Sequence, residues 1–399
     1  MSDSSDKVQK PALGLPGAWA MAVGGMIGGG IFSTLGVVIS VSGHWAAASF
    51  LIGGLIALAT GQSYSALTRK FDRAGGLYTF LRALGYHRLA RLAAWTLIAG
   101  YTLTVAVYGF TFGAYAANAF GADGRVSSFA AVAAITVLAG VNLAGAREAT
   151  IVELVAVWGK LAILLALAGI GLWHWAPERL VLDQDQPVRL LGALVGAGVV
   201  FMAYEGFQLL SYDYDEMRDP PHTIGLAMPL AIVMTIVVYM LVALGTPMLV
   251  PASEIVGQEE ISLAAAGQAA AGTAGLIAVT IAAIFSTASA INATVFATAR
   301  LAHRAANDAE LPKAFARENG AGVPWVGTVL ISSVAAVLAV IGGIQGLVEG
   351  GSFVFLIVFA AVNAIALQQR TGRQWASWTG FVGSIGAAGA LVAYLAGWV

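Results

Sequence analysis

Two ionisable side chains, Lys160 and Glu205, lie deep inside long apolar stretches of the sequence. A charged residue in hydrocarbon costs about 2.5–3.5 kcal/mol even on the scales measured during membrane insertion, so we expect both side chains to face the interior of a helix bundle. A buried lysine can gain and lose a proton, although Lys160 could instead snorkel to an interface. Glu205 could carry a proton, balance a cationic ligand, or accept hydrogen bonds from freed backbone N–H groups.

A run of glycines lies in the first apolar segment, where residues 24–30 include five of them. Each interior glycine costs a helix about 1 kcal/mol relative to alanine, so we predict a break there. Within a membrane, irregular backbone persists only where protein buries it or where it lines a wet cavity, and its N–H and C=O groups can hold a ligand. A second break is predicted in the sixth apolar segment, where glycines flank the aromatic cluster before Glu205. The alternative is that the glycines only let helices pack closely.

The elements that must position these residues are membrane-spanning helices. The 399-residue chain is 59% hydrophobic and 10% charged, with a mean hydropathy of +0.82, whereas soluble domains are about 25% charged. The pattern predicts an all-α integral membrane protein with about eleven transmembrane helices. The predicted spans lie near 14–38, 44–67, 91–119, 127–144, 149–173, 190–212, 224–250, 273–299, 324–343, 347–367 and 376–398.

The distribution of lysine and arginine predicts the orientation, because these residues favour the cytoplasmic side of short loops. Most of the 20 fall in loops on one side of the predicted spans, whereas Arg125, Arg179 and Arg189 fall on the other. We therefore expect a multi-pass protein of the cytoplasmic (inner) membrane. Its N-terminus would be cytoplasmic and its C-terminus extracytoplasmic.

Several classes of function are disfavoured by what the sequence lacks. The net charge of −1 argues against a nucleic-acid partner, and the absence of cysteine excludes thiol chemistry and Cys-based metal sites. No phosphate-binding loop is present, and all five histidines fall in or beside loops. An intramembrane enzyme would need more converging groups than Lys160 and Glu205, and no repeated pore-lining filter suggests a channel. We expect no enzyme activity, cofactor or metal.

Two interrupted spans five positions apart are typical of an inverted-repeat transporter. We therefore expect residues 13–175 to form a first five-helix repeat and residues 176–370 a second. Residues 371–399 would form a peripheral eleventh helix, and residues 1–12 a cytoplasmic tail.

Three motifs resemble, in order and spacing, those of the amino acid–polyamine–organocation superfamily, in particular its bacterial and archaeal amino-acid permeases. Residues 25–32 resemble the first-helix motif, and residues 201–207 with 215–220 resemble the sixth-helix motif and its acidic exit. Residues 286–293 with 299–300 resemble the eighth-helix motif. The resemblance covers most of the chain and implies the LeuT-like inverted repeat with broken helices 1 and 6. The family usually has twelve spans, one more than this chain is predicted to have.

The resemblance implies an amino-acid substrate held at the two breaks. The N–H groups of residues 28–30 would bind its carboxylate, and carbonyls near residues 22–26 and at the second break would accept from its ammonium. Phe201, Met202 and Tyr204 would line the side-chain pocket, with ordinary core packing as the alternative. The implied substrate-binding residues are Ala22, Met26, Ile27, Gly28, Gly29, Gly30, Phe201, Met202, Ala203, Tyr204 and Glu205.

The resemblance also implies a coupling ion. In some proton-coupled permeases of this superfamily, a lysine on span five occupies the place where sodium-coupled relatives bind a cation, and Lys160 resembles that lysine. The implied proton-coupling residues are Lys160, Gly24, Ser286, Ser289 and Glu205. We therefore expect a monomeric or homodimeric, proton-coupled and sodium-independent transporter of neutral amino acids. The alternative is a transporter or exchanger of polyamines, organic cations or cationic amino acids.

Overall fold

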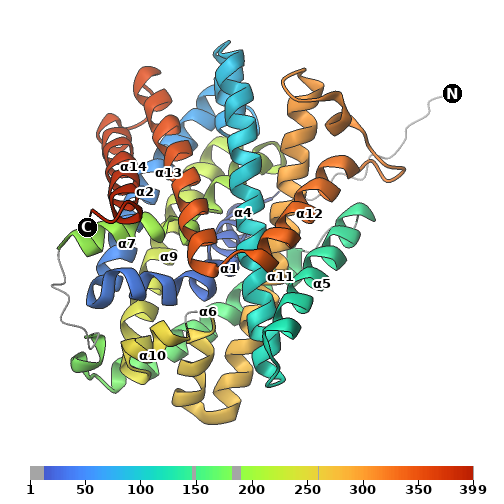
Figure 1. The fold of residues 1–399 in the computed structure, drawn as a ribbon. Coiled ribbons are helices and arrows are strands. Elements are labelled where there is room, and N and C mark those ends of the chain that lie inside the picture. The colour runs from blue at the N-terminus through green and yellow to red at the C-terminus, as the bar shows by residue number, and fades with distance from the viewer. Residues whose placement is uncertain (1–12, 146–149, 182–189, 259, 399) are drawn as a thin grey trace.

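The chain is built from helices joined mostly by short connections, as the computed structural model shows (Figure 1). The structure describes residues 13–145, 150–181, 190–258 and 260–398, so the predicted tail at residues 1–12 lies outside the described residues. Within these ranges the only strand-like feature is an isolated bridge between Leu13 and Met217, which confirms the all-α prediction.

The helices follow the predicted apolar segments closely. The α-helices are α1 (Leu15–Ser42), α2 (Ala46–Phe71), α3 (Leu77–Ala83), α4 (His87–Ala119), α5 (Gly124–Leu143), α6 (Thr150–Trp173), α7 (Leu190–Val199), α8 (Phe201–Tyr204), α9 (Pro220–Leu249), α10 (Ala252–Gly257), α11 (Ser262–Asn307), α12 (Trp325–Ile341), α13 (Ile344–Gln368) and α14 (Gln374–Leu395). The 3-10 helices are η1 (Gly43–Trp45), η2 (Pro177–Leu180), η3 (Phe207–Glu216) and η4 (Lys313–Ala316).

Length and composition identify fewer membrane spans than the eleven predicted. Among the described residues, eight helices are long and apolar enough to cross a membrane, or nine if the bent pair formed by α7 and α8–η3 counts as one span. The predicted count is therefore not confirmed. α1 and α2 count as one apolar stretch, Leu15–Phe71, because only η1 separates them. α12 has 17 residues, fewer than the roughly 20 that usually span a bilayer.

α1 is helical from Leu15 to Ser42, so the predicted break in the first span is wrong for this structure. The glycines instead let neighbouring elements approach the helix closely. A Cβ atom on Gly29 would overlap the Tyr108 ring, and one on Gly30 would lie 2.7 Å from the carbonyl oxygen of Ala203. These contacts compensate for the low helix propensity of glycine, which the sequence argument had weighed alone.

The predicted break in the sixth segment is confirmed. Within this segment, Leu191–Val199 and Phe201–Glu216 are bent by 46° relative to one another, and the helical conformation is interrupted again after Tyr204. Glu205 is extended, with φ −61° and ψ 142°, and Gly206 has φ 126°, a conformation that side chains of L-residues rarely adopt. The two residues therefore end α8 and redirect the chain into η3.

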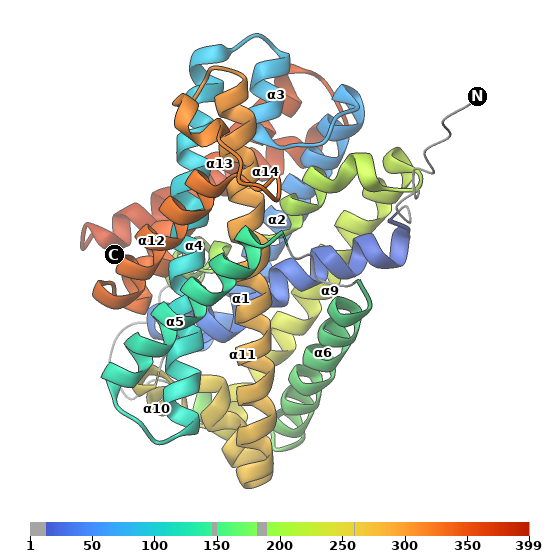
Figure 2. The same cartoon turned by 90° about the vertical axis from the view of Figure 1, so that its right-hand side faces the viewer.

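α1 occupies the centre of the bundle, where α6, α9 and α11 pack against it. Figure 2 shows α1 crossing α11 near the middle of the molecule, and Figure 1 shows the long α4 standing beside α11. The outer helices expose large apolar side chains, among them Phe129 on α5, Val337 on α12 and Trp378 on α14. An apolar outer surface is the expected complement to lipid.

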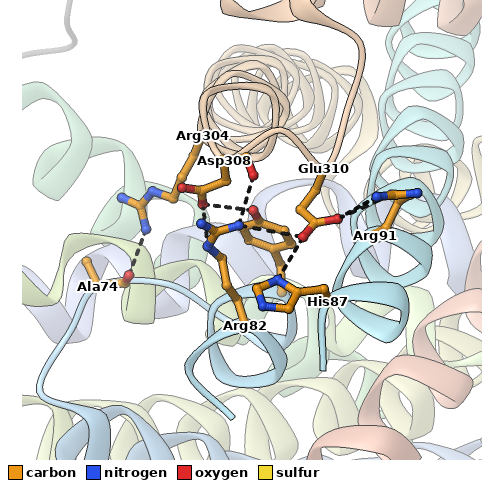
Figure 3. A network of polar contacts seen from close by, with 8 residues as sticks. Ala74, Arg82, His87, Arg91, Arg304, Asp308 and Glu310 are labelled. Atoms are coloured by element: carbon orange, nitrogen blue, oxygen red, sulfur yellow. Dashed lines mark hydrogen bonds and ion pairs between the residues drawn. The ribbon is translucent and has the colours of Figure 1, made fainter. Parts of the chain in front are cut away.

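One side of the molecule, which we name the α3 face, contains α3 and the end of α11 (Figure 3). Arg82 on α3 pairs through Nε with Asp308 Oδ2 at 3.1 Å, and the Tyr78 hydroxyl donates to the same carboxylate at 2.8 Å. Burial and the Asp308 carboxylate raise the pKa of Tyr78, so its hydroxyl remains protonated as a donor. These contacts fasten α3 to the turn that follows α11.

Glu310 completes this network, and its side chain is only 5% exposed. His87 Nδ1 lies 3.0 Å from one carboxylate oxygen and Arg91 Nη2 lies 3.2 Å from the other. Glu310→Gln should lower the free energy of unfolding by about 2 kcal/mol, since a buried, charge-assisted hydrogen bond is stronger than an exposed ion pair. Thermal unfolding in detergent measures this loss. The exposed carboxylate of Asp215 provides the control, because Asp215→Asn should unfold like the unaltered protein; equal midpoints for both variants would contradict the prediction.

Candidate functional site

Lys160 reaches from α6 to the backbone of α1. The residue is 6% exposed, and its Nζ donates to the Gly24 carbonyl oxygen at 3.2 Å. From α11, the Ser286 hydroxyl donates to the carbonyl oxygen of Ile27 at 2.9 Å. Three of the predicted proton-coupling residues, Lys160, Gly24 and Ser286, therefore meet along one turn of α1.

This turn of α1 accepts hydrogen bonds from three different helices. Besides Lys160 and Ser286, the Tyr239 hydroxyl of α9 lies 2.7 Å from the carbonyl oxygen of Met26 and 2.9 Å from that of Ala203. A carbonyl oxygen has two lone pairs, so it can accept a side-chain donor while it keeps its helical partner. The carbonyls of α1 are thus available to buried donors without the break that the sequence predicted.

A cavity of about 320 Å³ lies beside this turn, between α1, η3 and α11. At one end it is lined by Gly24, Gly25 and Ser289. At the other end it is lined by Arg300 and Arg304, and Arg304 lies at the α3 face, where it donates to the carbonyl oxygen of Ala74 at 2.8 Å (Figure 3). The cavity therefore connects the polar turn of α1 with the α3 face. Ser289, another of the predicted proton-coupling residues, lines this cavity.

The predicted substrate-binding residues do not line this cavity but lie in the bundle core. On α1, Gly28 packs against Ala290 of α11, and Gly30 packs against Ala203 of α8. The structure therefore brings the two predicted segments into direct contact at these glycines. The enclosed residues are Ala22, Met26, Ile27, Gly28, Gly29, Gly30, Phe201, Met202, Ala203, Tyr204 and Glu205.

The side chains of α8 make core contacts with α2 and α13. The Phe201 ring lies 5.7 Å from the Phe359 ring, centroid to centroid. The Tyr204 hydroxyl donates to the carbonyl oxygen of Phe50 at 2.7 Å. In this conformation the aromatic cluster is packed, which is the alternative that the sequence left open for it.

Glu205 is 1% exposed and sits at the break itself. Its Oε2 accepts from Gln208 Nε2 at 3.0 Å. The Oε1 of Gln208 accepts from the freed N–H of Gly206, also at 3.0 Å. Gln208 therefore satisfies both the carboxylate and the broken backbone, and its amide also lies 3.4 Å from the Tyr101 hydroxyl. The N–H of Gly206 is thus bound by Gln208 and not, as one sequence-based alternative had it, by Glu205.

Sequence reasoning missed three polar residues of the core: Gln208, Tyr239 and Glu349. Glu349 is 6% exposed on α13 and accepts from Gln345 at 2.8 Å. A carboxylate in an apolar segment was the signal that identified Glu205, and it applies equally to Glu349. Gln208 follows the break by two residues and could have been found by asking what satisfies the freed N–H of Gly206. Nothing in the sequence singled out Tyr239.

Comparison with known proteins gives one family across the chain. The family model described as amino acid permease matches residues 13–399. The inner membrane transport protein YbaT of Escherichia coli is 26% identical over 376 residues, which cover 93% of this chain and 86% of that protein. The serine/threonine exchanger SteT of Bacillus subtilis is 24% identical over 362 residues, covering 89% and 82%. The mitochondrial cationic amino acid transporter 3 of Arabidopsis thaliana is 25% identical over 374 residues, covering 88% and 61%.

The family match and the apolar helices agree with the three motifs that suggested the same superfamily. Family members and the similar proteins are membrane transporters and not enzymes. The chain therefore belongs to the amino acid permease family of the amino acid–polyamine–organocation superfamily, and it is a multi-pass membrane transporter.

Proposed function

We propose that the protein is a secondary active transporter that moves neutral amino acids across the cytoplasmic membrane by alternating access, driven by protons and independent of sodium. The observation that supports the coupling best is the 3.2 Å contact between Lys160 Nζ and the Gly24 carbonyl oxygen. A fixed ammonium against these carbonyls supplies the positive charge that a bound metal cation would otherwise supply. Loss of the proton would weaken the hold of α6 on α1, and this would couple protonation to the position of α1.

The 320 Å³ cavity suggests the path by which a proton reaches or leaves Lys160. Because Gly24 lines the cavity, we infer that a proton leaving Lys160 in this conformation exits toward the α3 face. We assign that face to the cytoplasm because arginines and lysines gather in its loops. The N-terminus would then be cytoplasmic and the C-terminus extracytoplasmic, and a second conformation would open the site to the other side.

For the substrate, we propose the junction of α1 with α8, which the Tyr108 ring closes in this conformation. That ring occupies the space beside Gly29. Within the described residues the Tyr108 hydroxyl is buried without a hydrogen-bond partner, and a buried donor left unpaired costs about 1–3 kcal/mol. A substrate carboxylate that displaced the ring from Gly29 would give this hydroxyl an acceptor. The inverted repeat of residues 13–175 and 176–370, with 371–399 as a peripheral helix, remains part of the proposal.

The proposed function is tested in two steps. Thermal unfolding with neutral amino acids, cationic amino acids and polyamines identifies the ligand class, because a ligand stabilises the folded state by RT ln(1 + [L]/Kd). Uptake of the best ligand into proteoliposomes is then measured with and without sodium and with an imposed pH gradient. Uptake that required sodium and ignored the pH gradient would overturn the proposal.

A second candidate substrate class is supported by the buried carboxylate of Glu205 and by the similarity to a cationic amino acid transporter. Glu205→Gln distinguishes the two classes, because it removes the charge and keeps the shape. Affinity for a neutral amino acid should change less than about tenfold, since Gln208 and not the ligand contacts the carboxylate.

The opposite outcome would identify a cationic ligand. Without the carboxylate, a cationic group at this depth would be desolvated and unpaired, at a cost of several kcal/mol. A loss of affinity beyond about a hundredfold, or 2.7 kcal/mol, would therefore move the assignment to polyamines or cationic amino acids. Glu254→Gln on α10 is the control, since the Glu254 carboxylate is exposed and lies outside the 320 Å³ cavity.

A further inference from the structure

The 320 Å³ cavity has charged walls where it approaches the α3 face. Arg300, His303 and Arg304 line it from α11, and Asp213 lines it from η3. The guanidinium carbon of Arg300 lies 5.2 Å from the ring centroid of Phe296, which holds the charge over an aromatic face. Two permanent positive charges thus share the mouth with the Asp213 carboxylate. Positive charge on the walls of a concave, low-dielectric site attracts anions.

Further in, small and weakly polar side chains from one face of α11 line the cavity. Ser289, Ala290, Ala293 and Ala297 of α11 follow one another at helical spacing and all line the cavity. Their small size leaves the volume of about 320 Å³ empty, which is within the range of sites for small ligands. The mouth therefore offers charge, and the interior offers apolar contact.

We propose that this cavity is a second, transient binding site for the transported amino acid on the α3-face side, with its carboxylate held by Arg300 and Arg304. The inference rests on the proposed function, and the site is distinct from the junction of α1 with α8. Arginine binds a carboxylate through two parallel hydrogen bonds, which favours this group over a hydroxyl or an amide. Asp213, on the facing wall, provides the counter-charge for the ammonium, so the site selects zwitterions over plain anions.

The electrostatic part of the proposal is testable without transport, because the chain contains no cysteine. Ala297→Cys places a single thiol inside the cavity, and Ala321→Cys places a reference thiol in the exposed loop before α12. Both are reacted with the membrane-impermeant anionic sulfonatoethyl and cationic trimethylammonioethyl methanethiosulfonates. Relative to the reference, the cavity thiol should favour the anionic reagent by about tenfold, and this preference should fall as salt is added.

Substitutions in the Ala297→Cys background assign the preference to its source. Arg300→Gln should reduce it several-fold and Arg300→Gln with Arg304→Gln should abolish it, whereas Arg300→Lys should keep it. Arg88→Gln is the matched control, because Arg88 is an exposed arginine outside the cavity. Absence of the preference, or its persistence in the double variant, would overturn the proposal.

Transport shows whether the substrate uses the site. In oriented proteoliposomes, Arg300→Gln should raise the half-saturation concentration for L-alanine about tenfold when the substrate is added on the α3-face side. A roughly tenfold change is the loss expected for one charge-assisted hydrogen bond. The half-saturation concentration measured from the opposite side should stay unchanged. Arg300→Lys should stay near the unaltered protein. Arg300→Gln could leave the half-saturation concentration unchanged although the thiol of Ala297→Cys prefers the anionic reagent. The cavity would then attract anions without binding the substrate, which contradicts the proposal. The thiol reaction needs no proton gradient. If the protein proved not to be proton-coupled, the cavity thiol would still prefer the anionic reagent, so the failure of the proposed coupling and the failure of the proposed cavity site give different results.

Discussion

Lys160→Ala abolishes accumulation of substrate against its gradient, and we expect this to be the largest functional effect of any single change at the site. The alanine cannot carry the proton, and it cannot donate to the Gly24 carbonyl oxygen that Lys160 contacts at 3.2 Å. A pH difference of one unit supplies about 1.4 kcal/mol per proton, enough for about tenfold accumulation. In proteoliposomes with an imposed pH gradient, the ratio of internal to external substrate should fall from that level to one.

Substrate binding should survive the same change, because Lys160 contacts α1 and not the junction of α1 with α8. Exchange of labelled for unlabelled substrate, which needs no driving force, should therefore continue in Lys160→Ala. Lys313→Ala is the control, since Lys313 is an exposed lysine on η4 outside the cavity. Gradient-driven accumulation by Lys160→Ala at the unaltered level would show that another group couples transport to protons.

The sequence predicted most of the helices and the partner of its most unusual residue. Long apolar segments predict helices reliably. A lysine within such a segment must face the interior of the bundle and contact a polar group there. The contact of Lys160 with Gly24 was predicted from that constraint together with the family resemblance, and the structure contains it. The break at Glu205 was also predicted, from the glycines on both sides of the aromatic cluster together with a carboxylate at membrane depth. A carboxylate followed by glycine is not a sufficient signal alone, since Glu349 and Gly350 lie within the unbroken α13.

The break predicted in α1 failed because helix propensity is a weak criterion beside packing. When each of the five glycines is assigned its helix-propensity cost relative to alanine, the summed cost favours a break. The stabilisation that offsets this cost comes from close packing against residues in distant parts of the chain. Gly29 meets Tyr108 of α4, and Gly30 meets Ala203 of α8. No local pattern around residues 24–30 identifies those partners, and the same limit hid the role of Tyr239 as a donor to Met26.

Gly206→Ala should prevent α1 from docking against the break, with loss of both stability and transport. Gly206 has φ 126°, where an alanine costs about 1–3 kcal/mol. A Cβ atom there would also lie 2.6 Å from the carbonyl carbon of Gly25 and 2.8 Å from the Met26 nitrogen. Both are backbone atoms of α1, so no side-chain rotation can relieve the overlap. Thermal unfolding and uptake in proteoliposomes measure the two losses.

Two glycines separate the causes of that loss. Gly272 has φ 60°, and a Cβ atom there would meet nothing within 4 Å, so Gly272→Ala reports the cost of the backbone conformation alone. Gly159, beside Lys160 on α6, has neither a positive φ nor a close neighbour, so Gly159→Ala should be neutral or slightly stabilising. If Gly206→Ala were no worse than Gly272→Ala, the approach of Gly25 to Gly206 would contribute nothing. A larger loss at Gly206 would show that the bundle depends on direct backbone contact between α1 and the broken segment. The substrate site that we propose at the junction of α1 with α8 requires this contact to loosen.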